Sequence, residues 1–133
     1  MTLTVSALDH LVLTVRDIPE AEAFYAKVLG MQVETFRPSD GTLRTALKFG
    51  TQKINLHAKG AEFEPKAAHP GPGTADLCFL SQHPLRDWLI HLQTGGVPVE
   101  AGPISRTGAT GPIESIYIRD PDGNLIEISN PAA

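Results

Sequence analysis

Leu8-Asp9-His10-Leu11-Val12-Leu13-Thr14-Val15 is the stretch that decides the fold. Apolar and β-branched residues alternate in it around one histidine, a pattern that predicts a β-strand. When the first half of the chain is moved along by 66 positions, His10 falls on Asp76 and Gly30 falls on Gly96. The offset stays constant through a strand, a helix and the start of the next strand. The chain is therefore predicted to contain an internal repeat.

Each copy of the repeat is predicted to fold as one strand, one helix and three further strands. Asp17 opens an Asp-x-x-Glu N-cap signature, and apolar residues at helical spacing lead to Gly30, where the helix stops. In the second copy the helix follows an apolar stripe from Leu85 to Leu92. Six of the other strands are expected at residues 31–36, 43–49, 52–57, 76–80, 115–119 and 124–129, and the repeat places the remaining one at Val99 and Glu100, which match Val33 and Glu34. The predicted fold is α+β, with two paired βαβββ modules whose mixed β-sheet forms a cup.

A segment rich in Gly, Pro and charge separates the two copies. We therefore expect a single domain, residues 1–133, made of a module at 1–58, a linker at 59–73 and a module at 74–133. With 133 residues, of which 41% are hydrophobic and 20% charged, the chain has the composition of a folded globular domain.

Composition also narrows the classes of partner. Eleven Lys and Arg against fifteen Asp and Glu leave a net charge of −4, which argues against nucleic acid and anionic membrane as partners. The only cysteine, Cys78, excludes an intrachain disulfide, and the chain begins without the pattern of a signal peptide. We expect a cytoplasmic protein that acts on a small molecule.

Residues of one chemical kind recur on one face of the predicted sheet. Strand alternation turns the apolar residues toward the helices and leaves His10, His57, Asp76 and Glu127 on the opposite face. Imidazoles and carboxylates from separate strands are typical ligands of a catalytic divalent metal. The simpler interpretations are a hydrogen-bonded strand histidine for His10 and a solvated edge charge for Glu127.

On these residues the sequence resembles the vicinal oxygen chelate superfamily, which includes glyoxalase I, extradiol dioxygenases, fosfomycin-resistance proteins and bleomycin-binding proteins. The resemblance covers essentially the whole chain and is carried by residues 8–15, 24–25, 29–31, 53–57 and 119–127. Residues 62–70 and 106–109 also look like the glyoxalase-domain-containing-protein-five type. The resemblance implies a homodimer and a cup built from paired modules. The cup would lie within one chain or be shared between two.

The resemblance also implies a set of metal ligands. His10 matches the ligand on the first strand and Glu127 the carboxylate on the last strand. Asp76 stands where many relatives have a second histidine. The remaining place is ambiguous, because Asn55 matches Glu127 by sequence whereas His57 lies two residues further along the same face. We prefer His57, since imidazole is the better ligand.

These residues predict a metal-dependent enzyme with glyoxalase-like lyase or isomerase chemistry, or dioxygenase-type chemistry. His10, His57 and Glu127 would hold a divalent Fe, Mn, Ni, Zn or Co ion that binds two adjacent oxygens of a small substrate. Asp76, as a general base, and Glu127 are the predicted catalytic residues. The predicted substrate contacts are Asn55, Arg106, Tyr117 and Arg119, with Arg106 expected in a loop.

Two other functions are compatible with the same fold. One is a metal-free binding protein of the bleomycin-resistance kind, and the other is a fosfomycin-type transferase. A sequestering groove relies on stacking surfaces. The chain has only five Phe, two Tyr and one Trp, and several of these have predicted core positions. The composition therefore favours the metal site.

Overall fold

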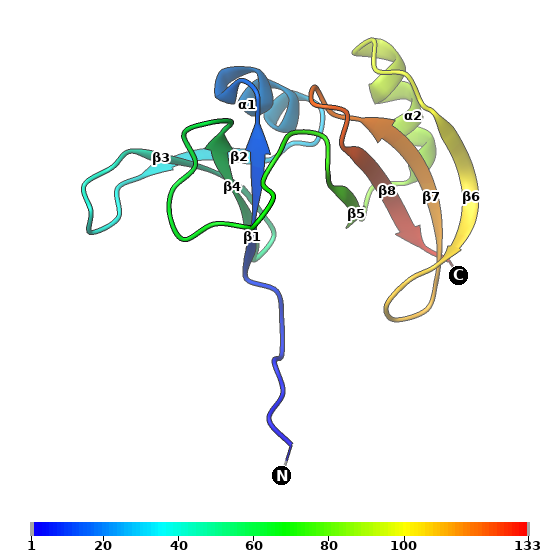
Figure 1. Cartoon of the computed structure of the whole chain (residues 1–133). Coiled ribbons are helices and arrows are strands. Elements are labelled where there is room, and N and C mark those ends of the chain that lie inside the picture. The colour runs from blue at the N-terminus through cyan, green and yellow to red at the C-terminus, as the bar shows by residue number, and fades with distance from the viewer. Residues whose placement is uncertain (1, 133) are drawn as a thin grey trace. The chain divides into compact units, whose positions relative to one another are not determined.

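The structure, a computed structural model, describes residues 2–132 and divides into two units, Met1–Gly71 and Pro72–Ala133. The first unit contains β1 (His10–Val15), α1 (Ile18–Lys27), β2 (Gln32–Phe36), β3 (Arg44–Phe49) and β4 (Gln52–Ala58). The second contains β5 (Asp76–Leu80), α2 (Leu85–Thr94), β6 (Ala101–Thr107), β7 (Pro112–Arg119) and β8 (Leu125–Pro131) (Figure 1). The α+β class and the βαβββ order of both halves are confirmed.

Each unit has one four-stranded mixed sheet, and the two sheets have the same topology. The strand orders are β1-β4-β3-β2 and β5-β8-β7-β6. In both units the first strand pairs in parallel with the last strand, and the other pairs are antiparallel. The helix makes the crossover that a parallel pair needs. The first and last strands of each unit therefore lie side by side at one edge of the sheet.

The register of these parallel pairs repeats as well. Val12 pairs with Asn55 in the first unit, and Cys78 pairs with Glu127 in the second. Cys78 follows Val12 by 66 positions, whereas Glu127 follows Asn55 by 72. The second unit thus has six more residues between its first and last strands, without any change in register. Asn55 is the counterpart of Glu127, and His57 is the counterpart of Ser129.

The core of each unit lies between its helix and one face of its sheet. In the first unit Val15, Ile54 and Leu56 on the strands and Tyr25 on α1 are almost completely buried. Asp17 caps α1 by accepting a hydrogen bond from the Glu20 amide at 3.1 Å, as its sequence signature predicts. In the second unit the equivalent core is Leu85, Leu92, Ile116, Ile118, Ile126 and Ile128. Strand alternation then leaves the opposite face of each sheet for polar residues.

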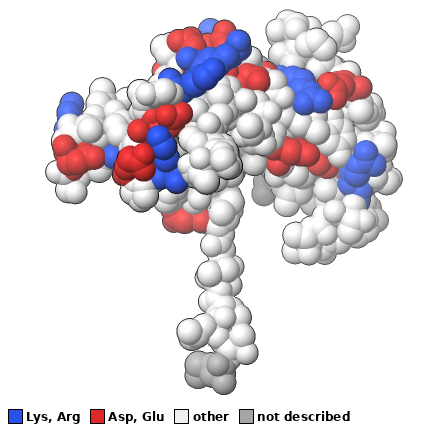
Figure 2. All heavy atoms as spheres, viewed as in Figure 1, with Lys and Arg blue, Asp and Glu red and all other residues white. Residues whose placement is uncertain are grey.

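Charges are mixed on the surface that Figure 2 shows, where Lys and Arg lie among Asp and Glu. Over residues 2–132, neither helix has the length and apolar character needed to span a membrane.

Candidate functional site

The helix-free face of the second unit lines a pocket of about 520 Å³. β5 and β8 contribute Cys78 and Glu127, which are paired in register, and β6 contributes Arg106. Residues 107–113, from the hairpin between β6 and β7, form most of the remaining wall. A carboxylate, a thiol and a guanidinium thus share one concave site, which is the usual form of a small-molecule site.

Two buried serines orient the carboxylate of Glu127. Ser115 Oγ donates to Glu127 Oε2 at 2.5 Å and lies 2.6 Å from Ser129 Oγ. Ser129 Oγ is in turn 3.2 Å from Cys78 Sγ. No Lys, Arg or His among residues 2–132 makes an ion pair with Glu127. The pocket therefore contains a carboxylate that is held by Ser115 and has no cationic partner among residues 2–132.

The thiol of Cys78 has a pKa above its ordinary value. Desolvation raises the pKa of its side chain, and the charge of Glu127 raises it further, while the hydrogen bond with Ser129 acts in the opposite direction. A protonated thiol is a poor nucleophile. The direction of this shift argues against Cys78, which lines the pocket, as a nucleophile.

Alkylation of Cys78 tests this assignment, because the chain has one cysteine. With iodoacetamide we expect a rate at pH 7.5 several times below that of N-acetylcysteine, followed over time by mass spectrometry, and a rate that still rises above the ordinary thiol pKa of about 8.5. Folding raises the pKa of Cys78, so the thiol contributes to the stability of the fold at pH values below its unfolded pKa. This contribution is lost as the pH rises through the pKa of the folded state. Cys78→Ser should remove this alkaline loss of stability. A rate that levels off below pH 8 would contradict the assignment.

Arg106 lies within strand β6, and not in a loop as we had expected. β6 pairs with β7 from Ile104 to Thr107 beyond a register shift that begins at Ala101. Arg106 Nε donates to the Tyr117 hydroxyl at 2.8 Å, and its guanidinium lies 5.5 Å from the Tyr117 ring centre. Tyr117 is itself paired with Glu127 in the sheet. The structure thus brings Arg106, Tyr117 and Glu127 together on one face.

The other predicted residues of this unit are differently placed. Arg119 is held by Glu100 through two hydrogen bonds of 3.0 Å, and it also donates to the Gly123 carbonyl at 3.1 Å. Asp76 is exposed at the start of β5, and its charge contributes to raising the pKa of Arg119 after the larger effect of Glu100. Neither Arg119 nor Asp76 lines the pocket.

His10 begins the first strand of the first unit. Its Nδ1 lies 2.8 Å from Asp9 Oδ2, and this hydrogen bond lowers the pKa of the Asp9 carboxyl. A carboxylate on Nδ1 selects the tautomer that leaves Nε2 as the free ring nitrogen. This second partner is typical of histidines that bind metals, and the preceding aspartate was the signal available in the sequence.

Asn55 contains the buried side-chain oxygen that lacks a hydrogen-bond partner among residues 2–132. Its neighbours in register are Val12 on β1 and Ala46 on β3, and neither side chain has a polar group. A buried oxygen without a partner is costly, so it needs an explanation such as a ligand. Asn55 Oδ1 is thus an unpartnered acceptor or metal-ligand atom on the helix-free face, at the position that Glu127 has in the second unit.

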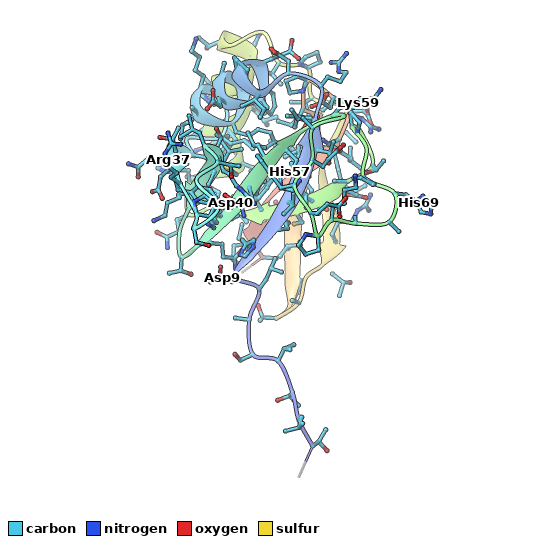
Figure 3. All side chains as sticks on the ribbon, turned by 60° about the vertical axis from the view of Figure 1, so that its left-hand side comes forward. Asp9, Arg37, Asp40, His57, Lys59 and His69 are labelled. Carbon is cyan, nitrogen blue, oxygen red and sulfur yellow. The ribbon has the colours of Figure 1, made fainter. Side chains whose placement is uncertain are left out.

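His57 is enclosed on the same face. It is 7% exposed, its ring is 5.3 Å from that of Phe63, and the Arg44 guanidinium lies 3.9 Å from the centre of the Phe63 ring. Burial lowers the pKa of His57, and the charge of Arg44 lowers it further. Figure 3 shows His57 on the sheet and His69 on the outer side of the loop that follows β4. Phe63, on this loop, packs against His57.

Within the part of the chain that the structure describes, no group of three or more His, Cys, Asp or Glu side chains could hold a metal ion. The donors that do occur have the right chemistry. They comprise one imidazole nitrogen, one unpartnered amide oxygen and one carboxylate oxygen without a cationic partner. The sequence alone indicated His10, Asn55 and Glu127. It did not indicate three residues that contact candidate side chains: Asp9 bonds His10, Ser129 bonds Glu127, and Phe63 packs on His57.

Comparison with known proteins gives consistent results. The sequence profile of the Glyoxalase/Bleomycin resistance protein/Dioxygenase superfamily matches residues 7–128. Virulence protein STM3117 of Salmonella typhimurium is 54% identical over 127 residues, which are 96% of this chain and 85% of that protein. Glyoxalase domain-containing protein RDO1 of Mycosarcoma maydis is 55% identical over 128 residues, or 96% of this chain and 70% of that protein.

A solved structure has the same fold throughout. Integron cassette protein VCH_CASS1, from the mobile metagenome of V. cholerae, superposes with a TM-score of 0.93 at 53% identity. The match covers 99% of this chain and 100% of that one. The profile match spans far more than half of the chain, and both relatives exceed half identity over nearly all of it. The chain therefore belongs to the glyoxalase/bleomycin resistance protein/dioxygenase superfamily, also called the vicinal oxygen chelate superfamily.

Proposed function

We propose that the protein is a small divalent-metal-dependent enzyme that acts on a substrate with two adjacent oxygen atoms. Its reaction would be of the glyoxalase-like lyase or isomerase type, or of the dioxygenase type. Proteins of this superfamily often use divalent metals, although some are metal-free. The support for a metal here comes from the donor residues of this chain.

The single observation that carries the proposal is the state of Glu127. Its carboxylate lines the pocket, is oriented by Ser115, and makes no ion pair with another described residue. A partly buried carboxylate is costly unless a cation or several hydrogen bonds compensate it. A bound divalent cation would supply that compensation.

His10 is also a proposed metal ligand, because Asp9 fixes its ring and leaves Nε2 free. Asn55 and His57 compete for the remaining place. The shared register and the unpartnered oxygen favour Asn55. His57 has a strong donor atom, but it contacts Phe63 and lies close enough to the positive charge of Arg44 to be affected by it.

A bound metal would supply Lewis acidity to the two substrate oxygens. The protein side chains would do the rest. Asp76 is the proposed general base, since it is an exposed carboxylate on the same sheet face as Glu127. Tyr117 and Arg106 would orient the substrate, because they form a hydrogen-bonded pair beside Glu127. A homodimer and a cytoplasmic location belong to the same proposal.

Metal titration of the purified full chain tests the function. After chelation and dialysis we expect one equivalent of Mn²⁺, Fe²⁺, Co²⁺, Ni²⁺ or Zn²⁺ to bind per chain, measured by mass spectrometry of the metal content. His10→Ala should weaken binding by more than about tenfold, because even partners of ligands contribute 10–100-fold. His69→Ala, an exposed histidine on the loop after β4, is the matched control. Absence of binding by the wild type for all five metals would contradict the proposal.

A metal-free binding protein is the second candidate, and the pocket favours it in one respect. Much of the pocket wall is apolar, from Leu80, Ile113, Pro112 and Pro131 among others. Such a wall suits capture of a small organic molecule with or without chemistry. The same titration separates the two functions, since only the enzyme requires stoichiometric metal.

A further inference from the structure

The pocket of the second unit has a positive side chain that nothing in the described chain neutralises. Arg106 is the sole Lys or Arg among the residues that line it. Its hydrogen bonds go to the Tyr117 hydroxyl at 2.8 Å and, at 3.4 Å, to the Ser105 carbonyl. No carboxylate among residues 2–132 pairs with it. By contrast, Arg119 is paired with Glu100 and Arg44 with Asp40.

Tyr117 orients the guanidinium of Arg106. The hydroxyl oxygen accepts the proton of Nε, and the ring centre lies 5.5 Å from Cζ. With Nε engaged in this way, the terminal Nη2 group keeps both of its protons for a ligand. The guanidinium of Arg106 thus offers free N–H groups to an oxygen anion in the pocket.

Charge and shape indicate which anion fits. One guanidinium neutralises one negative charge, and no second Lys, Arg or His is among the described residues that line the pocket. A single guanidinium would leave one charge of a phosphate dianion unpaired, whereas a carboxylate matches the planar fork of arginine one to one. The wall supplied by Leu80, Ile113 and Pro112 suits an apolar body. A volume of about 520 Å³ lies within the range of small-molecule sites.

We propose that this pocket binds a small organic monocarboxylate, whose carboxylate pairs with Arg106 and whose apolar body packs on Leu80 and Ile113. Tyr117 is a positioning residue for Arg106. A monocarboxylate would be the substrate class of the proposed function. This proposal rests on that function only for the metal that would bind at the Glu127 end of the pocket.

Matched pairs of ligands test the charge requirement on the full chain. The probes are propionate with propionamide, hexanoate with hexanamide, and phenylacetate with phenylacetamide, titrated by NMR chemical-shift changes. In at least one pair we expect the acid to bind more than about tenfold tighter than the amide, a difference of roughly 1.4 kcal/mol. Arg106→Gln should abolish this preference. Arg86→Gln, which makes the same charge change at an exposed position on α2, should keep it.

Further variants and a metal readout separate the outcomes. Tyr117→Phe should reduce the acid preference several-fold while circular dichroism stays unchanged, because the variant removes only the hydroxyl that holds Nε. Equal binding of acid and amide, or no binding of any probe by the wild type, would overturn the inference. Metal titration of Arg106→Gln should match the wild type. If the wild type binds no metal but still prefers the acid, only the metal-dependent function is refuted.

Discussion

Replacement of Glu127 by glutamine should lower the affinity of the protein for the proposed divalent metal by more than about a hundredfold, since even residues behind the ligands contribute 10–100-fold. Glutamine has nearly the shape of glutamate and keeps an oxygen that can accept the hydrogen bond from Ser115. The variant therefore removes the negative charge with little disturbance of the buried serines. Isothermal titration with the metal that the wild type binds gives the two dissociation constants.

Glu114→Gln is the matched control for this prediction. Glu114 lies on β7 one residue before Ser115, so strand alternation turns its exposed side chain away from the face that carries Glu127. It should bind metal as the wild type does. Equal affinities of the two variants would remove Glu127 from the metal site.

The same metal titration distinguishes the two candidate metal ligands of the first unit, Asn55 and His57. Asn55→Ala should weaken metal binding more than His57→Ala, because the Asn55 oxygen lacks a partner while His57 is enclosed by Phe63. If His57→Ala weakens metal binding more than Asn55→Ala, His57 is the ligand, as the sequence analysis preferred because imidazole is the stronger ligand.

Which residues share a face could be predicted from the sequence, because the side-chain period of a strand is two. His10, Asn55, His57 and Glu127 all lie on the helix-free faces, as alternation requires. The register between strands could not be predicted in the same way. A slip of two residues keeps every side chain on its face, so the sequence pattern was unable to rank Asn55 and His57. The hydrogen-bonded pairing of each unit settles that register.

The contacts of irregular segments were beyond sequence reasoning for a different reason. Residues 59–71 have no apolar period, so nothing indicated that Phe63 would pack on His57. Strand β6 was obscured by Gly102 and Pro103. Gly102 has a φ of +102°, and a side chain there would collide with the Ser115 carbonyl, so this irregular start of the strand requires glycine.

Hydrogen bonds join two separate segments of the second unit at Asp120-Pro121-Asp122-Gly123-Asn124. This stretch carried part of the family resemblance. Asn124 is 1% exposed, and its Oδ1 accepts from the Ala75 amide at 2.9 Å. Its Nδ2 donates to Asp120 Oδ2 at 2.8 Å, and Asp120 Oδ1 accepts from the backbone amides of Asp122 and Asn124. The turn between β7 and β8 is thereby joined to the start of β5.

Asn124→Ala should therefore destabilise the protein strongly. It leaves the Ala75 amide and Asp120 Oδ2 without these partners, and each buried polar group that loses its bond costs about 1–3 kcal/mol. We expect the free energy of unfolding to fall by about 2–5 kcal/mol, a large part of the 5–15 kcal/mol typical of a domain. Urea denaturation followed by circular dichroism measures the change.

Gln93→Ala is the control, because it also truncates a carboxamide side chain, but at an exposed position on α2. Its effect should stay within about 0.5 kcal/mol, as for other exposed sites. If Asn124→Ala were as mild as Gln93→Ala, the side-chain bonds to Ala75 and Asp120 would not hold β5 to the turn. The expected large difference would instead show that this part of the family motif stabilises β5 beside β8, and so keeps Cys78 beside Glu127 in the pocket.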